Sequence, residues 1–202
     1  MKRQNETRTR RLSGRARAFL LAVCMWPAMV LGQSRAIDAG QSSLRVHVFK
    51  TGFFSAFAHD HEIEAPIANG TIDLSTIPGV ALRVDARRLR VLDPEASTGT
   101  RDEIQKTMEG PAVLDFERFP DIGFQSTRVE QRGTDHWMVQ GDLTLHGQTK
   151  PVVVDVALKD GHYRGSATIK QRDFGMTPVS VAGGTVKVKD EVRIEFDIVL
   201  AQ

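Results

Sequence analysis

The sequence predicts an all-β, antiparallel fold, either a barrel or a sandwich, from three observations. Short segments with apolar residues at every second position recur along most of the chain. A period of two is the pattern of a strand with one apolar and one polar face. Turn-forming residues separate these segments at regular spacing, and a long alternating segment, residues 192–200, closes the chain. Many short strands with this spacing are typical of an antiparallel barrel or sandwich.

The alternating segments define the expected strands in chain order. They fall at residues 44–48, 57–63, 72–74, 80–84, 122–124, 137–145, 152–158, 163–170 and 192–200. Asn69-Gly70 is expected to form a bend before the third of them. His146-Gly147-Gln148 is expected to form a tight turn that joins two strands into a hairpin.

One short helix is expected between the mid-chain strands. Thr100 and Glu103 have the spacing of a capping box, with the threonine as N-cap. Ile104 and Met108 then share one helical face, and Gly110-Pro111 ends the helix. This helix either lies over a barrel mouth, packs outside the wall, or simply connects two strands.

The first 36 residues have the organisation of a secretory signal peptide. Seven Lys and Arg residues precede an apolar stretch at residues 18–31, and small residues follow it. This order predicts export and cleavage near Gly32 or Ala36. The apolar stretch is short for a membrane span, and an uncleaved anchor is the alternative. We therefore expect residues 1–36 to be removed and residues 37–202 to form one domain.

The charge of the chain changes when this segment is set aside. The whole chain has 27 basic and 25 acidic residues; residues 1–36 contain eight and one of these, which leaves 19 and 24, a net charge near −5. This balance argues against a nucleic-acid partner. The one cysteine, Cys24, lies in the segment expected to be removed. Neither a disulfide nor thiol chemistry is therefore expected in the domain.

Four segments carry a resemblance to a known family. Residues 141–154 read GDLTLHGQTKPVVV, residues 116–126 FERFPDIGFQS, residues 172–176 RDFGM and residues 192–198 VRIEFDI. In their residues and in their order along the chain, these segments resemble the YceI-like family, lipocalin-like barrels of the bacterial cell envelope. The resemblance covers roughly residues 37–202. It implies a periplasmic barrel of about eight strands, in some members a homodimer, whose tunnel holds a long polyisoprenoid chain.

The resemblance implies a non-catalytic protein that sequesters or carries a polyprenol or an isoprenoid quinone and needs no other cofactor. Transient contact with a membrane surface is a further possible interaction. Strand parity then selects the apolar residues predicted to line the tunnel and bind this lipid: Phe57, Ile72, Leu82, Phe124, Leu143, Val154 and Phe196. A register error of one residue would reverse the face of each. Four basic residues either meet an anionic head group or membrane surface, or form a solvated rim: Lys170, Arg172, Lys187 and Lys189.

His59 and His61 lie two residues apart on an expected strand, so their side chains point the same way. We predict that they bond a ligand head group at the barrel mouth. The first alternative is a metal- or haem-binding envelope enzyme centred on this pair, with His47 and His146 as candidates for a third ligand. The second is a structural role for both imidazoles. A filled barrel that acts as an interaction module is a further alternative to lipid binding.

Overall fold

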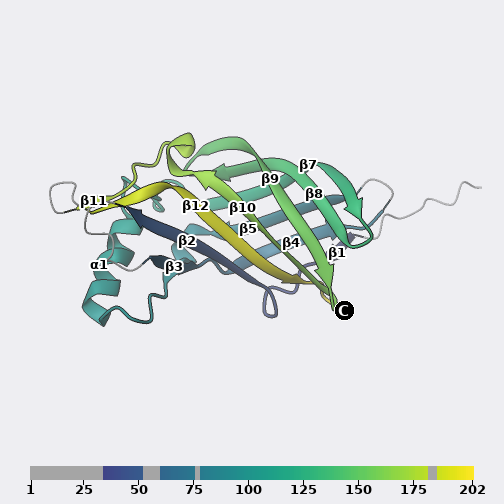
Figure 1. Cartoon of the computed structure of the whole chain (residues 1–202), viewed down its shortest axis with the longest axis horizontal. Coiled ribbons are helices and arrows are strands. Elements are labelled where there is room, and N and C mark those ends of the chain that lie inside the picture. The colour runs from purple at the N-terminus through teal and green to yellow at the C-terminus, as the bar shows by residue number, and fades with distance from the viewer. Residues whose placement is uncertain (1–33, 52–59, 76–77, 182–185) are drawn as a thin grey trace, which may run out of the picture. The chain divides into compact units, whose positions relative to one another are not determined.

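A computed structural model describes residues 34–51, 60–75, 78–181 and 186–202 of the chain. Within the unit Gly32–Gln202, the described residues form one strongly curled antiparallel sheet with one α-helix beside it (Figure 1). The predicted all-β, lipocalin-like class with one helix between mid-chain strands is confirmed. The helices and strands occur in the following order: β1 (Ser34–Ala36), β2 (Ser43–Thr51), β3 (His61–Glu64), β4 (Ile67–Asp73), β5 (Gly79–Asp85), η2 (Ala86–Arg88), β6 (Arg90–Val91), α1 (Thr98–Glu109), β7 (Asp121–Gly133), β8 (His136–Leu145), β9 (Gln148–Lys159), β10 (His162–Lys170), η3 (Gln171–Phe174), β11 (Ser180–Val181) and β12 (Val186–Val199).

The order of the strands in the sheet is β1-β4-β5-β7-β8-β9-β10-β12-β2-β3-β6, and β11 pairs with β12. β3 and β4 follow each other across Ala65-Pro66 and behave as one bent strand, because the Ala65 amide still donates to the Leu44 carbonyl of β2 (2.9 Å). Counted in this way, the wall has eight principal strands, as predicted. The short strands β1, β6 and β11 add to its margins.

The sheet curls far enough to bring the residues that follow β1 against the end of β12. The path of paired strands runs from β1 to β6, and among the described residues these two strands do not pair with each other. Immediately after β1, however, Ile37 forms a bridge with Leu200, and the Asp38 amide donates to the Val199 carbonyl (2.8 Å). The β1 margin is therefore fastened to the end of β12.

The predicted hairpin turn is present between β8 and β9. His146 (φ 50°) and Gly147 (φ 69°) both adopt left-handed conformations. Two consecutive left-handed residues are the signature of the tight type I′ turn, whose twist matches that of the flanking strands. Gly147 is required there for a second reason, because a Cβ atom at this position would lie 2.5 Å from Cε1 of Phe119.

Two predicted details are wrong. The helix begins before Thr100, because Ser97 is the N-cap: its Oγ accepts a hydrogen bond from the Thr100 amide (3.2 Å). Asn69-Gly70 is no bend but lies inside β4, next to a register shift between Ile67 and Asn69. Gly70 serves close packing instead, because a Cβ there would lie 2.6 Å from Cδ1 of Ile37.

Helix α1 lies at one end of the curled sheet (Figure 1). Of its residues, Met108 is buried and belongs to the larger apolar core cluster. Of the three placements left open by the sequence, the helix lies over one end of the barrel, opposite to the end at which the cavity opens. In the part of the chain that the structure describes, no helix has both the length and the apolar character needed to span a bilayer.

Candidate functional site

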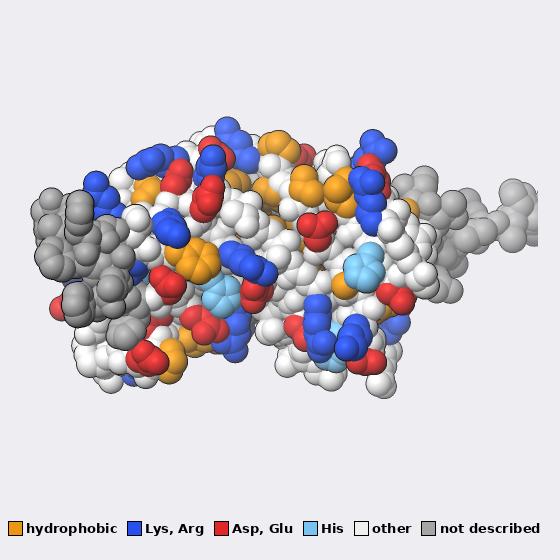
Figure 2. Space-filling model, viewed as in Figure 1, with side chains coloured by type: hydrophobic (Ala, Val, Ile, Leu, Met, Phe, Trp, Pro, Cys, Tyr) orange, Lys and Arg blue, Asp and Glu red, His pale blue; other side chains and the backbone are white. Residues whose placement is uncertain are grey.

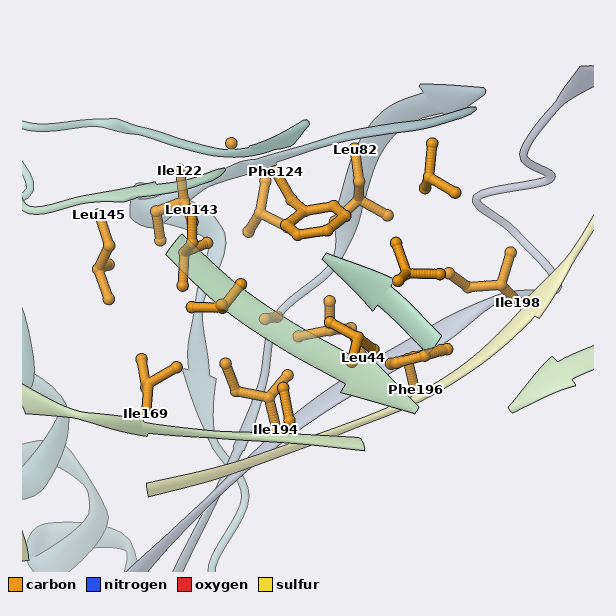
Figure 3. Close-up of a pocket in the computed structure, with 18 of the residues that line it drawn as sticks. Leu44, Leu82, Ile122, Phe124, Leu143, Leu145, Ile169, Ile194, Phe196 and Ile198 are labelled. Carbon is orange, nitrogen blue, oxygen red and sulfur yellow. The ribbon is translucent and has the colours of Figure 1, made fainter. Parts of the chain in front are cut away.

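The curled sheet encloses a cavity of about 700 Å³. Its wall consists of the inward-facing side chains at alternating strand positions, seen in Figure 3. Along β8 these positions run from Trp137 to Leu145, eight residue steps or about 26 Å at the usual rise of a strand. The interior is therefore hollow, and the filled-barrel alternative does not fit.

The lining predicted from strand parity is placed on the cavity wall wherever the structure describes it. Six of the seven residues line the cavity: Ile72, Leu82, Phe124, Leu143, Val154 and Phe196. The seventh, Phe57, lies outside the described residues. That these side chains contact a lipid stays a prediction.

Two glycines make room for the aromatic rings of the wall. A Cβ on Gly141 of β8 would lie 2.4 Å from Cζ of Phe124, and one on Gly165 of β10 would lie 2.6 Å from Cζ of Phe196. Each ring therefore packs over the backbone of a neighbouring strand. Phenylalanine is the largest residue of the predicted lining. Because each ring packs over a glycine, it does not block the lumen.

The cavity is closed at the end where α1 lies. Met108 of α1, Leu114 of the following loop and Met176 after η3 all line it, and each is at most 7% exposed. No pattern in the sequence predicts this cap as a whole. The sequence gives a weak indication that Met108 is buried, because it shares a helical face with Ile104. Leu114 and Met176 lie outside any periodic segment, so no pattern predicts their burial.

The cavity opens at the opposite end, where the β4–β5, β7–β8 and β9–β10 connections meet. Leu74 lines the cavity there and is 44% exposed, and Pro78 and Gln131 are exposed lining residues as well. The rings of Trp137 and Tyr163 also line this end, with their centroids 6.2 Å apart. We call this opening the mouth.

Among its described lining residues, the mouth has few polar groups and no cationic one. Asp73 lies at its edge, where hydrogen bonds from the side chain and the amide of Ser75 hold the pKa of the Asp73 carboxyl below its ordinary value. Ser75 and Gln131 are further polar lining residues at this end. Among the described residues of the cavity wall there is no lysine, arginine or histidine.

His61 lies at the end of the sheet away from the mouth. Its Nδ1 is 2.5 Å from Oδ2 of Asp93, whose other carboxylate oxygen accepts the Glu62 amide (2.9 Å). Asp93 is 6% exposed and precedes α1, so this pair ties β3 to the loop before the helix. His61 does not line the cavity. His59 lies outside the described residues, and contact of either imidazole with a head group stays a prediction.

The two other histidines weighed as metal ligands point elsewhere. His47 is on β2, with Nε2 3.4 Å from Oε2 of Glu195. His146 donates through Nδ1 to the Phe174 carbonyl (2.9 Å), and its ring packs edge-on against Phe119. Across the described ranges, no group of three or more His, Cys, Asp or Glu side chains is arranged to hold a metal ion. The described residues therefore provide no set of ligands for the alternative of a metal site.

The four basic residues singled out from the sequence lie together near the closed end. They line a second, open groove of about 480 Å³ with Asp190 and Glu191 among them: Lys170, Arg172, Lys187 and Lys189. The Arg172 amide donates to Oδ1 of Asp190 (2.9 Å). We call this feature the basic groove. It lies on β10, η3 and β12, far along these strands from the mouth.

A curled antiparallel sheet around an apolar cavity that opens at one end defines a lipocalin-like fold. The sequence profile of the YceI-like domain matches residues 36–200, nearly the whole described part of the chain. The protein belongs to the YceI-like family.

Relatives and a solved structure agree with this assignment. A UPF0312 protein of Vibrio cholerae is 29% identical over 126 residues, 57% of this chain and 61% of the relative. A UPF0312 protein of Pseudomonas syringae pv. tomato is 36% identical over 107 residues, 48% of this chain and 56% of the relative. The matched region thus spans less than two thirds of either. The crystal structure of Burkholderia cenocepacia BcnA shares the fold, with a TM-score of 0.60 and 18% identity over 82% of this chain and 99% of that one.

Proposed function

We propose that this protein is an exported, non-catalytic binding protein that holds a long isoprenoid lipid, a polyprenol or an isoprenoid quinone, in its cavity. The observation that carries the proposal is the hollow, apolar interior with one open end. Its volume lies in the usual range for ligand sites, about 300–1,000 Å³. The protein sequesters the lipid or carries it across the periplasm, and residues 1–36 direct it there.

The energetics suit a carrier. Burial is worth about 0.8 kcal/mol per methylene, so three or four isoprene units contribute roughly 10–15 kcal/mol relative to water, before ordering costs. A lipid that leaves a bilayer is already in an apolar environment, so the net gain against the membrane is much smaller. The protein therefore keeps the chain from water during transit and still releases it to a membrane.

The mouth favours an uncharged head group. A phosphate there would meet the ionised Asp73 and no cation on the described cavity wall. A charge moved out of water is stabilised only by an opposite charge or by hydrogen bonds. Trp137, Tyr163 and Gln131 instead offer aromatic faces and an amide, which suit the hydroxyl of a polyprenol or the ring and carbonyls of a quinone.

The proposal is tested by native mass spectrometry on protein purified from its own periplasm. We expect a copurifying lipid with the mass of a polyprenol or a quinone. Ala167→Phe places a ring into the lumen from β10, since Ala167 lines the cavity, and should reduce the bound lipid at least fivefold. Thr168→Phe is the matched control, because the next residue of the same strand is exposed.

The absence of bound lipid, together with no uptake of added polyprenol or quinone, would contradict the proposal. Stoichiometric metal or haem in protein purified without a histidine tag, lost in the His59→Ala/His61→Ala variant, would instead support the alternative of an envelope enzyme. Equal lipid content in Ala167→Phe and Thr168→Phe would show that the lipid binds outside the cavity.

A further inference from the structure

The rim of the mouth exposes a large apolar side chain that belongs to the cavity wall. In the described part of the chain, two large hydrophobic residues are strongly exposed, Leu74 (44%) and Val153 (53%). Val153 lies on the outer wall of β9, opposite Gln140. Leu74 lies at the mouth and lines the cavity, and Pro78 across the same connection is exposed too. The exposed apolar surface at Leu74 is thus continuous with the lumen.

The aromatic residues of the mouth are of the kind found where a protein meets a membrane surface. The chain has two tryptophans and one tyrosine, and Trp26 lies in the segment expected to be removed. The remaining two, Trp137 and Tyr163, lie together at the mouth with their centroids 6.2 Å apart. Such side chains, apolar with one polar atom, concentrate at membrane–water interfaces.

The charged residues named around the mouth form ion pairs with residues of opposite sign. Arg128 and Arg132 both pair with Glu130 (2.6 Å each), and Arg164 pairs with Asp197 (2.7 Å). Positive and negative side chains are also interspersed over the face drawn in Figure 2. A surface of this kind neither attracts nor repels a bilayer strongly, so its contact with one would rest on the apolar rim.

The basic groove is the competing surface, but it lies at the wrong end for lipid exchange. Four cations there would favour anionic lipid. The cavity at that end is sealed by Met108, Leu114 and Met176. A protein docked through the basic groove would hold its mouth away from the bilayer, and the lipid would have to cross water.

We propose that the mouth rim seats on the surface of a lipid bilayer, with Leu74 entering the interface beside Trp137 and Tyr163. The isoprenoid chain then passes between bilayer and cavity without exposure to water. The identity of the passing lipid rests on the proposed function, whereas the docking surface is tested separately from it.

The test measures binding of the mature protein to neutral phosphatidylcholine vesicles by co-sedimentation and by the emission of Trp137. Wild type should bind weakly, with a blue shift of the emission and quenching by brominated acyl chains. Leu74→Asp should lower the partition constant about tenfold, the order expected for keeping one leucine side chain out of an apolar environment. Val153→Asp is the matched control and should bind like wild type, because it removes an equally exposed apolar side chain away from the mouth.

Docking and ligand binding are separated by a second measurement on the same proteins. A quinone with two isoprene units, added without vesicles, should bind equally to wild type and Val153→Asp, because Val153 does not line the cavity. Failure of this quinone and of polyprenol to bind wild type, with normal vesicle binding, would reject the proposed function and leave the docking surface intact.

Two results would overturn the docking proposal. One is equal vesicle binding by Leu74→Asp and Val153→Asp. The other is binding that needs anionic phosphatidylglycerol and is lost in Lys187→Glu/Lys189→Glu, which would assign docking to the basic groove. Arg88→Glu/Lys106→Glu controls for net charge, because both residues are exposed and lie outside that groove and the cavity wall.

Discussion

Asp197 on β12 shows how single residues stabilise the outer wall. Its carboxylate oxygens bond Nδ1 of His162 (2.5 Å) and Nε of Arg164 (2.7 Å), both on the neighbouring strand β10. Burial alone would raise the pKa of Asp197, but these two hydrogen bonds hold it below its ordinary value. A carboxyl with a lower pKa in the folded than in the unfolded protein stabilises the fold above its unfolded pKa, and this contribution is lost as the pH falls through the folded pKa.

Asp197→Asn should therefore lower the free energy of unfolding at pH 7 by about 1 kcal/mol, the scale of a partly exposed carboxylate with two partners. The difference from wild type should shrink as the pH falls below about 4, because the carboxyl of the unfolded chain then takes up a proton, and that of the folded protein does so at still lower pH. Urea unfolding at pH 7 and pH 3 measures both values. Asp155→Asn on the adjacent strand β9 is the control. A deficit that is the same at both pH values would show that the side-chain shape, and not its charge, matters.

Among the elements, helix α1 depends most on contacts distant in sequence. The local sequence pattern predicts Thr100 as the N-cap, with Glu103 three residues on, but the N-cap is Ser97. The structure uses Ser97 because the preceding loop is fixed: buried Asp93 bonds β3, and Arg101 donates to the Ala96 carbonyl (2.7 Å). With this loop held in place, the helix begins a turn earlier than its own sequence indicates.

Ser97→Ala should destabilise the protein by about 1 kcal/mol, because the Thr100 amide loses the acceptor that caps the helix. Thr100→Ala should cost clearly less, since it removes only the contact between the two hydroxyl groups (2.9 Å). Urea unfolding followed by circular dichroism compares the two. The reverse order of the two costs would restore Thr100 as the functional cap.

The molecule as a whole has a core that its own side chains leave open. A cavity of about 700 Å³ deprives the surrounding wall of packing partners, which is costly in a protein interior. A ligand that binds only the folded state supplies these partners and adds to stability by mass action, about 2.7 kcal/mol at a hundredfold excess over its dissociation constant.

Extraction of the bound lipid should thus lower the melting temperature by about 5–10 °C, given about 2–4 °C per kcal/mol for a domain of this size. Re-addition of polyprenol or quinone should restore it. Differential scanning calorimetry on lipid-bound, extracted and reloaded protein measures the shift. Ala167→Phe, which should hold less lipid, should show a much smaller shift on extraction than wild type; an equal shift in this variant would argue against the cavity as the site.

Much of the wall was predictable from the sequence. The period of two assigns Leu82, Phe124 and Leu143 to the inner face, and the structure places all three there. The turn at His146-Gly147 was predictable as well, since few residue pairs tolerate two left-handed conformations. The placement of His61 was not, because strand parity gives the face of a side chain and leaves open which end of the sheet it occupies.

By itself the sequence determined the family, the antiparallel strands and the face of the predicted lining residues that the structure describes. These features depend on local residue spacing and on short sequence motifs. Only the tertiary structure decided that the interior is hollow, that Met108, Leu114 and Met176 close one end, and that Leu74 and Trp137 share the other. The distance between opposite walls depends on how the whole sheet curls, and no local pattern along the chain encodes the separation of strands that never pair.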